Sequence, residues 1–187
     1  MSNIAVMFAS HRKNGLSKEL TEILKEYKQH NFEIIKLSET GFEPCVHCLR
    51  CSITGKCMRH PDTFNETVEK LRSAEAIIFV SPLYTPVPSR FSAFLERLTS
   101  IGYFYRMKNG GSGGPLKGKR CAVICYDSTG VNGMLEGLIK QVLKPCLIDS
   151  SEVNLSVIDG IFIAEYKELE TLNMDVSAYM RYVLNRI

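Results

Sequence analysis

Short apolar runs that alternate with segments of helical periodicity constrain the fold of this chain more than any other feature. Residues 4–8 form an apolar run, residues 16–27 carry apolar side chains three and four positions apart, and residues 32–37 form a second apolar run. Spacings of three and four are typical of one helix face, and short apolar runs are typical of buried strands. The opening of the chain therefore predicts a strand, a helix and a second strand.

The same alternation continues to the end of the chain. Further strands are expected at residues 76–80, at 119–126 and within 153–163, and further helices at 64–71, 91–101, 134–142 and 166–183. The run at 76–80 is apolar throughout, as in a strand buried on both faces. Five strands separated by helices predict an α/β fold with a doubly wound parallel sheet and helices on both faces. Such sheets bind ligands beyond the carboxyl ends of their strands.

The composition is that of an ordinary globular chain and excludes several functions. Of the 187 residues, 45% are hydrophobic and 23% are charged, and the net charge is +3, values that fit one domain covering residues 1–187. The basic residues are spread along the chain, so no nucleic-acid partner is expected. No segment approaches the roughly 20 apolar residues of a membrane span, and Met1 runs directly into an apolar strand without a signal-peptide pattern. We expect a cytoplasmic protein with no membrane partner.

A cysteine array lies within a loop insertion at about residues 41–62. Its C-x2-C-x2-C-x5-C spacing is formed by Cys45, Cys48, Cys51 and Cys57. Two-residue gaps let successive thiolates converge on one centre, as in iron-sulfur proteins, and Gly55 gives the backbone freedom to turn Cys57 toward the other three. The array predicts a metal or cluster site.

Two other interpretations of the array remain open. Zinc sites of four thiolates are common, although they usually pair two C-x2-C motifs across about 15 to 20 residues. A disulfide pair would need an oxidising compartment, whereas the cytoplasm keeps thiols reduced. His47 and His60 are interpreted as solvated side chains rather than ligands. The remaining cysteines lie in apolar runs typical of the core: Cys121, Cys125 and Cys146.

The loop after the first predicted strand suits a phosphate group. Residues 9–17 are rich in hydroxyl, amide and cationic groups, and a helix N-terminus together with Arg12 favours an anion there. The loop contains neither G-x-G-x-x-G nor a Walker motif, so neither a dinucleotide fold nor an NTPase is indicated. The alternative is that Ser10 or Asn14 only caps the helix.

Two further loops at the carboxyl ends of strands can line a planar ligand. Residues 81–89 contain three prolines, which stiffen the path, and Tyr84 could lie along the edge of a ring. The alternative is a plain helix entry with Ser89 near its cap. Residues 126–133 offer small side chains whose backbone can approach a flat ligand closely, although the same residue types occur in ordinary strand-to-helix turns.

Together these segments resemble a known family. The resemblance is carried by Ser10-His-Arg-Lys-Asn-Gly15, by Ser81-Pro-Leu-Tyr84 leading through Phe91 and Phe94-Leu-Glu-Arg97, and by Leu116-Lys-Gly-Lys119. These runs look like the NADPH-dependent FMN reductase family of flavodoxin-like proteins. The cysteine array, placed after the second strand, resembles the iron-sulfur flavoprotein branch of that family. This resemblance implies a flavodoxin-like, five-stranded parallel sheet in the order 2-1-3-4-5.

The resemblance also implies which residues hold the cofactors. FMN would be bound at its phosphate by Ser10, Arg12, Asn14 and Ser17, along its ring by Pro82, Leu83, Tyr84 and Thr85, and on the other side of the ring by Ser128, Thr129 and Gly130. The four cysteines of the array would ligate a [4Fe-4S] cluster. The chain departs from the family at His11, where a proline is common, and at Thr85-Pro86, where many relatives have an aromatic residue or a glycine.

A flavin carries its own chemistry, and no catalytic acid-base group stands out in the sequence. The resemblance implies an FMN-dependent oxidoreductase that takes electrons from NADPH, NADH or a ferredoxin-type donor. It would pass them to a small acceptor or through the cluster, as a homodimer or homotetramer. The cysteine loop is expected at the same sheet edge as the flavin loops. The alternatives are a non-enzymatic electron carrier that binds FMN and a cluster, and a zinc-stabilised binding module.

Overall fold

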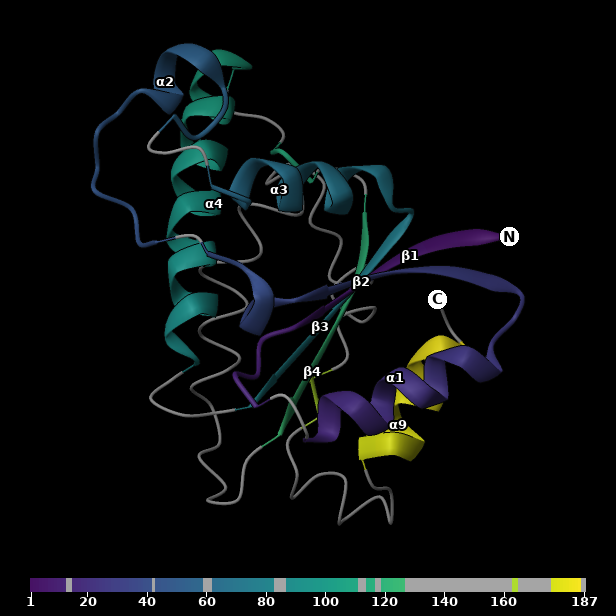
Figure 1. Ribbon diagram of the computed structural model, residues 1–187. Helices are drawn as coiled ribbons and strands as arrows, with labels where there is room; N and C mark the ends of the chain where they lie inside the picture. The colour runs from purple at the N-terminus through teal and green to yellow at the C-terminus, as the bar shows by residue number, and fades with distance from the viewer. Residues whose placement is uncertain are drawn as a thin grey trace.

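The computed structural model of the chain describes residues 1–12, 15–41, 43–58, 62–82, 87–110, 114–116, 119–126, 163–164 and 176–185. In chain order (Figure 1), its elements are β1 (Ser2–Phe8), α1 (Leu16–Glu26), β2 (His30–Lys36), η1 (Leu37–Glu39), α2 (Cys51–Thr54), α3 (Phe64–Ser73), β3 (Ala76–Pro82), α4 (Ser89–Lys108), β4 (Arg120–Tyr126), β5 (Ile163–Ala164) and α9 (Val176–Leu184). The four long strands and helices α1, α3 and α4 fall where the apolar pattern predicts them. The helix expected at residues 134–142 lies outside the described residues.

The strands form one parallel sheet in the order β2-β1-β3-β4, with the short β5 beside β4. The predicted parallel α/β architecture and the order of the first four strands are confirmed. In place of the five strands predicted, the structure describes four strands of seven residues each and, at the fifth position, only the two residues of β5. The rest of the segment expected there, residues 153–162, lies outside the described residues.

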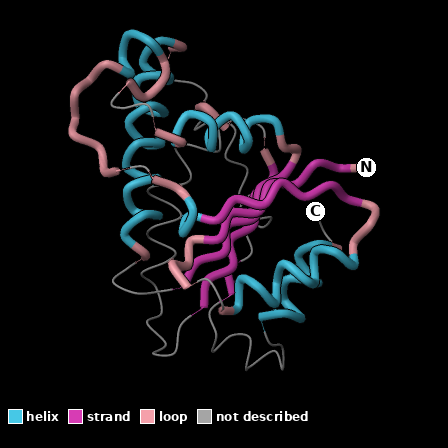
Figure 2. The backbone as a smooth tube through the Cα atoms, viewed as in Figure 1, coloured by secondary structure: helices cyan, strands magenta, loops and turns pink. Residues whose placement is uncertain are grey.

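Helices cover both faces of this sheet (Figures 1 and 2). Alternate residues of β1 enter opposite cores: Ala5 and Met7 belong to the cluster formed with α3 and α4, whereas Val6 and Phe8 belong to the cluster formed with α1 and α9. This alternation is what a pleated strand between two layers requires. All seven residues of β3 are buried, which confirms the interpretation of its continuous apolar run. Within the described residues, no helix combines the length and apolar composition that crossing a bilayer requires.

The carboxyl ends of β1, β2 and β3 lie together at one edge of the sheet. Phe8 pairs with Lys36 on one side and with Val80 on the other, and the Ala9 N–H donates to the Val80 carbonyl oxygen over 2.8 Å. Strands β1 and β3 therefore end side by side. Helix α4 begins after the β3 loop, with Pro88 as its N-cap residue.

The segment between β2 and α3 runs from η1 along the outer side of α4 to α2 (Figure 1). Helix α2 packs on the C-terminal end of α4, where Lys108 Nζ donates to the Ile53 carbonyl oxygen over 2.8 Å. Helix α4 thus contacts the described part of this segment at several points.

Candidate functional site

The turn between β1 and α1 presents a helix N-terminus that no described side chain caps. Gly15 is the N-cap residue of α1. Ser10 is buried, and its Oγ accepts a hydrogen bond from the Arg12 N–H over 3.2 Å. The interpretation of Ser10 as the helix cap is therefore wrong, and Asn14 lies outside the described residues. The first N–H groups of α1 and the positive end of its dipole are suited to an anion.

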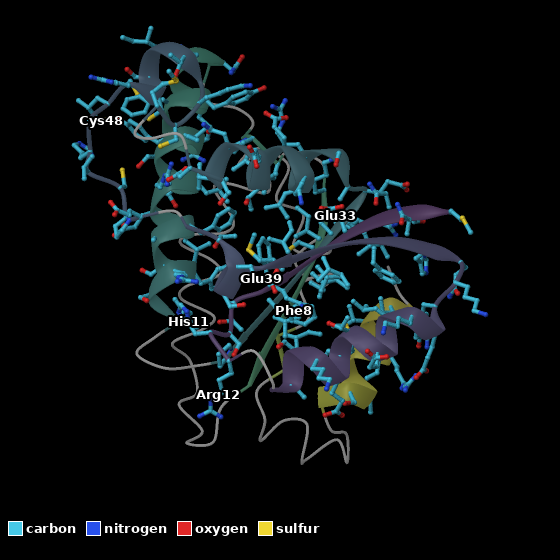
Figure 3. The ribbon with its side chains drawn as sticks, viewed as in Figure 1. Phe8, His11, Arg12, Glu33, Glu39 and Cys48 are labelled. Atoms are coloured by element: carbon cyan, nitrogen blue, oxygen red, sulfur yellow. The ribbon has the colours of Figure 1, made fainter. Side chains whose placement is uncertain are left out.

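Four of the residues expected to bind FMN lie at this edge of the sheet. Ser10 and Ser17 are buried, Arg12 is exposed at the edge (Figure 3), and Pro82 is the buried last residue of β3. The others lie outside the described residues: Asn14, Leu83, Tyr84, Thr85, Ser128, Thr129 and Gly130. A role in FMN binding stays a prediction for the whole set.

The cysteines of the array line one pocket against α4. Cys45 follows Pro44 in an irregular stretch, Cys48 lies on the next turn, Cys51 begins α2, and Cys57 follows α2. The pocket has an empty volume of about 350 Å³, part of it open to solvent. Its other lining residues are His47, Leu49, Met58, Arg97, Ser100, Ile101 and Phe104. The structure therefore brings together the four thiols that the sequence assigns to one site.

Left-handed backbone conformations shape the turns of this segment. His47 and Leu49, on either side of Cys48, have φ angles of 52° and 59°, which cost a non-glycine residue about 1–2 kcal/mol each. Gly55 follows α2 with a φ of 71°, and its N–H donates to the Cys51 carbonyl oxygen over 2.9 Å. A glycine adopts this conformation without strain, so α2 can end there and the chain can turn back into the pocket, as expected for Gly55.

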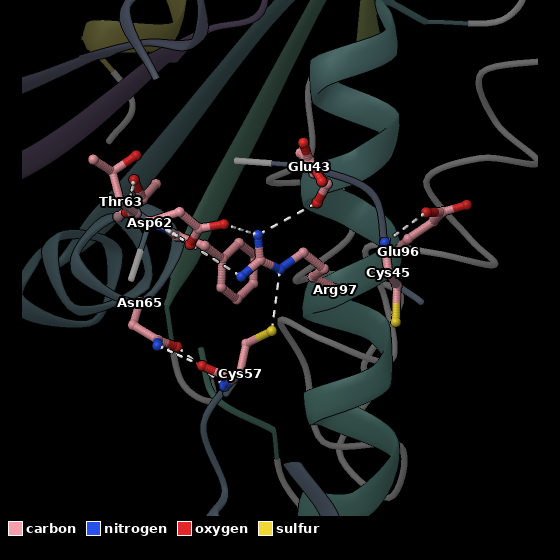
Figure 4. Close-up of polar contacts among 10 residues, drawn as sticks. Glu43, Cys45, Cys57, Asp62, Thr63, Asn65, Glu96 and Arg97 are labelled. Atoms are coloured by element: carbon pink, nitrogen blue, oxygen red, sulfur yellow. Dashed lines mark hydrogen bonds and ion pairs between the residues drawn. The ribbon is translucent and has the colours of Figure 1, made fainter. Parts of the chain in front are cut away.

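Arg97 of α4 holds one side of the pocket (Figure 4). Its side chain is 1% exposed, and its two terminal nitrogens donate to the Asp62 carboxylate over 2.5 and 3.1 Å. The Nε–H donates to Cys57 Sγ over 3.2 Å, and Nη1 donates to the Glu43 carbonyl oxygen over 3.3 Å. The guanidinium carbon lies 4.1 Å from the centre of the Phe64 ring, within the range of a cation–π interaction.

Burial and neighbouring charge set the protonation of these groups. Burial raises the pKa of the Cys51 thiol, and the other thiols of the array raise it further. Burial acts to lower the pKa of Arg97, but hydrogen bonds to Asp62 and Cys57 outweigh it and raise that pKa. A guanidinium that keeps its positive charge therefore lies beside the array.

The four thiols are candidate ligands for two kinds of centre, a zinc ion or an iron-sulfur cluster. Zinc–sulfur bonds of about 2.3 Å place the sulfurs of a tetrahedral zinc site about 3.8 Å apart. Within the described ranges, no group of three or more His, Cys, Asp or Glu side chains is arranged to hold a metal ion. The four cysteines of the array are free thiols, so the disulfide alternative does not describe this structure. Four thiols around one pocket are a donor set that suits either centre.

The cysteine pocket lies away from the edge where β1 and β3 end. Cys48 and Arg12 lie at opposite ends of the molecule in Figure 3. A helix rises 1.5 Å per residue, which places the pocket residues Arg97 to Phe104 about 12 to 22 Å along α4 from Ser89. The expectation that the cysteine loop shares the sheet edge with the flavin loops is therefore wrong, because the segment follows α4 back from that edge.

Sequence analysis missed the residues that contact the cysteines of the array, namely Asn65, Glu96, Arg97 and Ser100, and it missed Asp62, which pairs with Arg97. The Ser100 Oγ lies 3.6 Å from Cys45 Sγ. A signal for Arg97 was present, since it lies three residues after Phe94 and four before Ile101, on the apolar stripe of α4. A charge on such a stripe is buried and must have partners. That position could have been recognised as part of a site.

The chain is similar in sequence to proteins that are named for flavin cofactors. The sequence model of the family described as NADPH-dependent FMN reductase matches residues 2–147. An iron-sulfur flavoprotein of Methanocaldococcus jannaschii is 32% identical over 83 residues, which span 43% of this chain and 42% of that relative. An FMN-dependent NADH:quinone oxidoreductase of Pseudomonas fluorescens is 24% identical over 139 residues, which span 66% of this chain and 69% of that relative.

The fold is also found in solved structures. The NAD(P)H:quinone oxidoreductase from Methanothermobacter marburgensis matches with a TM-score of 0.60 and 16% identity, over 96% of this chain and 98% of that one. At this identity the likeness shows the fold alone. The fold is therefore shared over nearly the whole chain. The sequence similarity to the iron-sulfur flavoprotein, by contrast, spans less than half of that relative.

Proposed function

This chain belongs to the NADPH-dependent FMN reductase family, and we propose that it is an FMN-dependent oxidoreductase that passes electrons from NADPH or NADH to a small acceptor. The match of the family over residues 2–147 carries the proposal. A relative named as an FMN-dependent NADH:quinone oxidoreductase supports it. A quinone is therefore the class of acceptor to test first.

FMN would be held at the edge where β1 and β3 end. The N-terminus of α1, which no described side chain caps, offers backbone N–H groups to the phosphate, and Arg12 can add a fork of donors. The buried Ser10 and Ser17 lie before this turn and in the first turn of α1. The proposed set is completed by Asn14 at the phosphate, by Pro82, Leu83, Tyr84 and Thr85 along the ring, and by Ser128, Thr129 and Gly130 on its other side.

When bound, FMN supplies the redox chemistry by accepting a hydride from the nicotinamide and releasing electrons to the acceptor. The residues of the chain then need to bind the phosphate and orient the ring at the strand ends. No catalytic acid or base is proposed among them.

We extend the proposal to a [4Fe-4S] cluster ligated by Cys45, Cys48, Cys51 and Cys57. Four thiolates are the usual donor set of such a cluster, and the thiols line one pocket. Similarity to an iron-sulfur flavoprotein supports this assignment. A zinc-stabilised binding module is disfavoured by the compact cysteine motif, since four-thiolate zinc sites usually pair two C-x2-C motifs across about 15 to 20 residues.

The remaining assignments are proposed from the sequence and the family resemblance. One domain covers residues 1–187, with the cysteine-rich segment as an insertion at about residues 41–62. The protein acts in the cytoplasm as a homodimer or homotetramer. A ferredoxin-type protein is proposed as an alternative electron donor.

Steady-state oxidation of NADPH and NADH tests the proposed activity. Protein reconstituted with FMN is mixed with either nucleotide and a benzoquinone, and the nicotinamide absorbance is followed with FMN-free protein as the control. FMN-dependent turnover is the expected result. FMN binding without turnover would identify a non-enzymatic electron carrier instead, and failure to bind FMN would contradict the proposal as a whole.

A further inference from the structure

The charge of Arg97 is buried in a place where only a specific set of contacts can stabilise it. Removing a guanidinium from water is costly unless the group is paired and its donors are satisfied. Arg97 meets this requirement through two hydrogen bonds to Asp62, whose side chain is 11% exposed, and through the face of Phe64. These contacts leave the guanidinium little freedom to move.

The guanidinium joins both ends of the cysteine segment to α4. Glu43 precedes Cys45 and accepts from Nη1 through its carbonyl oxygen, while Asp62 follows Cys57 and accepts from both terminal nitrogens. The Nε–H donates to Cys57 Sγ over 3.2 Å (Figure 4). By contrast, Cys45 Sγ contacts the Ser100 hydroxyl and the His47 N–H. A cationic donor is therefore aimed at one particular sulfur of the array.

We infer that Arg97 is a positioning residue that fixes Cys57 as a ligand and raises the reduction potential of the centre bound by the four thiolates. The inference rests on the cluster assignment of the proposed function. Reduction adds negative charge to a thiolate-ligated centre, and hydrogen bonds to its sulfurs stabilise that charge and tune the potential. Arg97 supplies both an N–H···S contact and a positive charge, so it favours the reduced form.

Asp62 has the opposite electrostatic effect on the same centre. Its carboxylate compensates the charge of Arg97 and lies on the far side of the guanidinium from Cys57. In Asp62→Asn the amide oxygen can still accept from Arg97, while the compensating negative charge is removed. The two substitutions, Arg97→Gln and Asp62→Asn, should therefore shift the potential in opposite directions, which a purely structural role would not produce.

The test is a redox titration of the cluster in anaerobically reconstituted protein, for the wild type, Arg97→Gln and Asp62→Asn. Lys70→Gln is the matched control because it removes a charge from the exposed ion pair with Glu33. We expect Arg97→Gln to weaken the preference for the reduced form about tenfold, a shift of about 59 mV to more negative potential for a one-electron couple. Asp62→Asn should shift the potential to a more positive value, and Lys70→Gln should leave it unchanged.

The outcomes separate this inference from the cluster assignment. Loaded variants with the wild-type potential, or with shifts in the same direction, would overturn the role of Arg97 and leave the cluster in place. A wild-type protein that takes up no iron and sulfide would contradict both the cluster assignment and the role of Arg97. If Arg97→Gln does not fold, as judged by its thermal unfolding, Asp62→Asn decides alone, and a potential that is unchanged or more negative would refute the inference.

Discussion

The cysteine pocket and the proposed flavin edge are built in different ways. In the pocket, side chains from segments far apart in the sequence contact one another, as Arg97 does with Cys57 and Asp62. At the edge, the groups suited to an anion include the backbone N–H groups at the start of α1, whose N-cap residue is Gly15. The comparison teaches that a site made by strand and helix ends can be recognised from topology, whereas a site held by side chains depends on partners that local patterns do not reveal.

Cys57→Ser should have the largest effect and should show whether the two regions act separately. The substitution removes one proposed cluster ligand and the acceptor of the Arg97 Nε–H. We expect complete loss of iron after anaerobic reconstitution, measured by iron assay, with FMN affinity unchanged in a fluorescence titration. Cys121→Ala alters a buried thiol outside the array and should keep its iron. Loss of FMN together with iron would show that the two sites depend on each other, which would contradict their separation.

Gly15→Asp should affect only the flavin edge. Its carboxylate would cap α1, which favours the helix by a few tenths of a kcal/mol relative to glycine, while repelling the phosphate of FMN. We expect FMN to bind roughly tenfold more weakly, about 1.4 kcal/mol, with unchanged iron content and a slightly raised Tm. The control is Gly15→Ala, whose Cβ would lie at an ordinary 3.5 Å from Arg12 Cβ. Unchanged FMN affinity in Gly15→Asp would argue against a phosphate at this turn.

Ser100→Ala should weaken the cysteine pocket modestly. It removes the hydroxyl 3.6 Å from Cys45 Sγ, a neutral contact weaker than that of Arg97 with Cys57. We expect release of iron to a chelator to become about threefold faster, in line with the loss of one neutral hydrogen bond. Ser73→Ala removes an exposed hydroxyl bonded to the Lys70 carbonyl oxygen and should not change the rate. If iron were released faster from Ser100→Ala than from Arg97→Gln, the contact of Ser100 with Cys45 would be the stronger of the two, contrary to this prediction.

The smallest effect is expected at the Glu26–Arg181 ion pair, which joins α1 to α9 away from both sites. The hydrogen bond from Arg181 lowers the pKa of Glu26 below its ordinary value of 4.5. The stabilisation is therefore complete above pH 4.5 and is lost as pH falls through the folded-state pKa. Glu26→Gln should lower the Tm slightly at pH 7, and its difference from the wild type should shrink below pH 4.5. A difference that stays constant with pH would contradict this assignment.

Most of the described fold could be predicted because each element carries its own pattern. The continuous apolar run of β3 identified a strand buried on both faces, and the stripe of α1 identified a helix packed on the sheet. The prediction fell short where the pattern is mixed. Helix α4 extends to Lys108 rather than ending near residue 101, because exposed Tyr103, Tyr105 and Met107 interrupt its apolar stripe.

The candidate site could be predicted only in part. The cysteine spacing correctly placed four thiols around one pocket, because that spacing acts within a short segment. Arg97 is 40 positions from Cys57, so their contact depends on how the insertion packs against α4. The sequence also gave no indication of the positive φ angles at His47 and Leu49, since neither residue is a glycine.

Cofactor analysis of anaerobically purified protein tests the central claim most directly. Flavin, iron, acid-labile sulfide and zinc are measured on one sample, together with its ultraviolet-visible spectrum and its FMN uptake on reconstitution. The account predicts one FMN and about four iron atoms per chain, without zinc. Colourless protein that takes up no FMN, or stoichiometric zinc in place of iron, would contradict it.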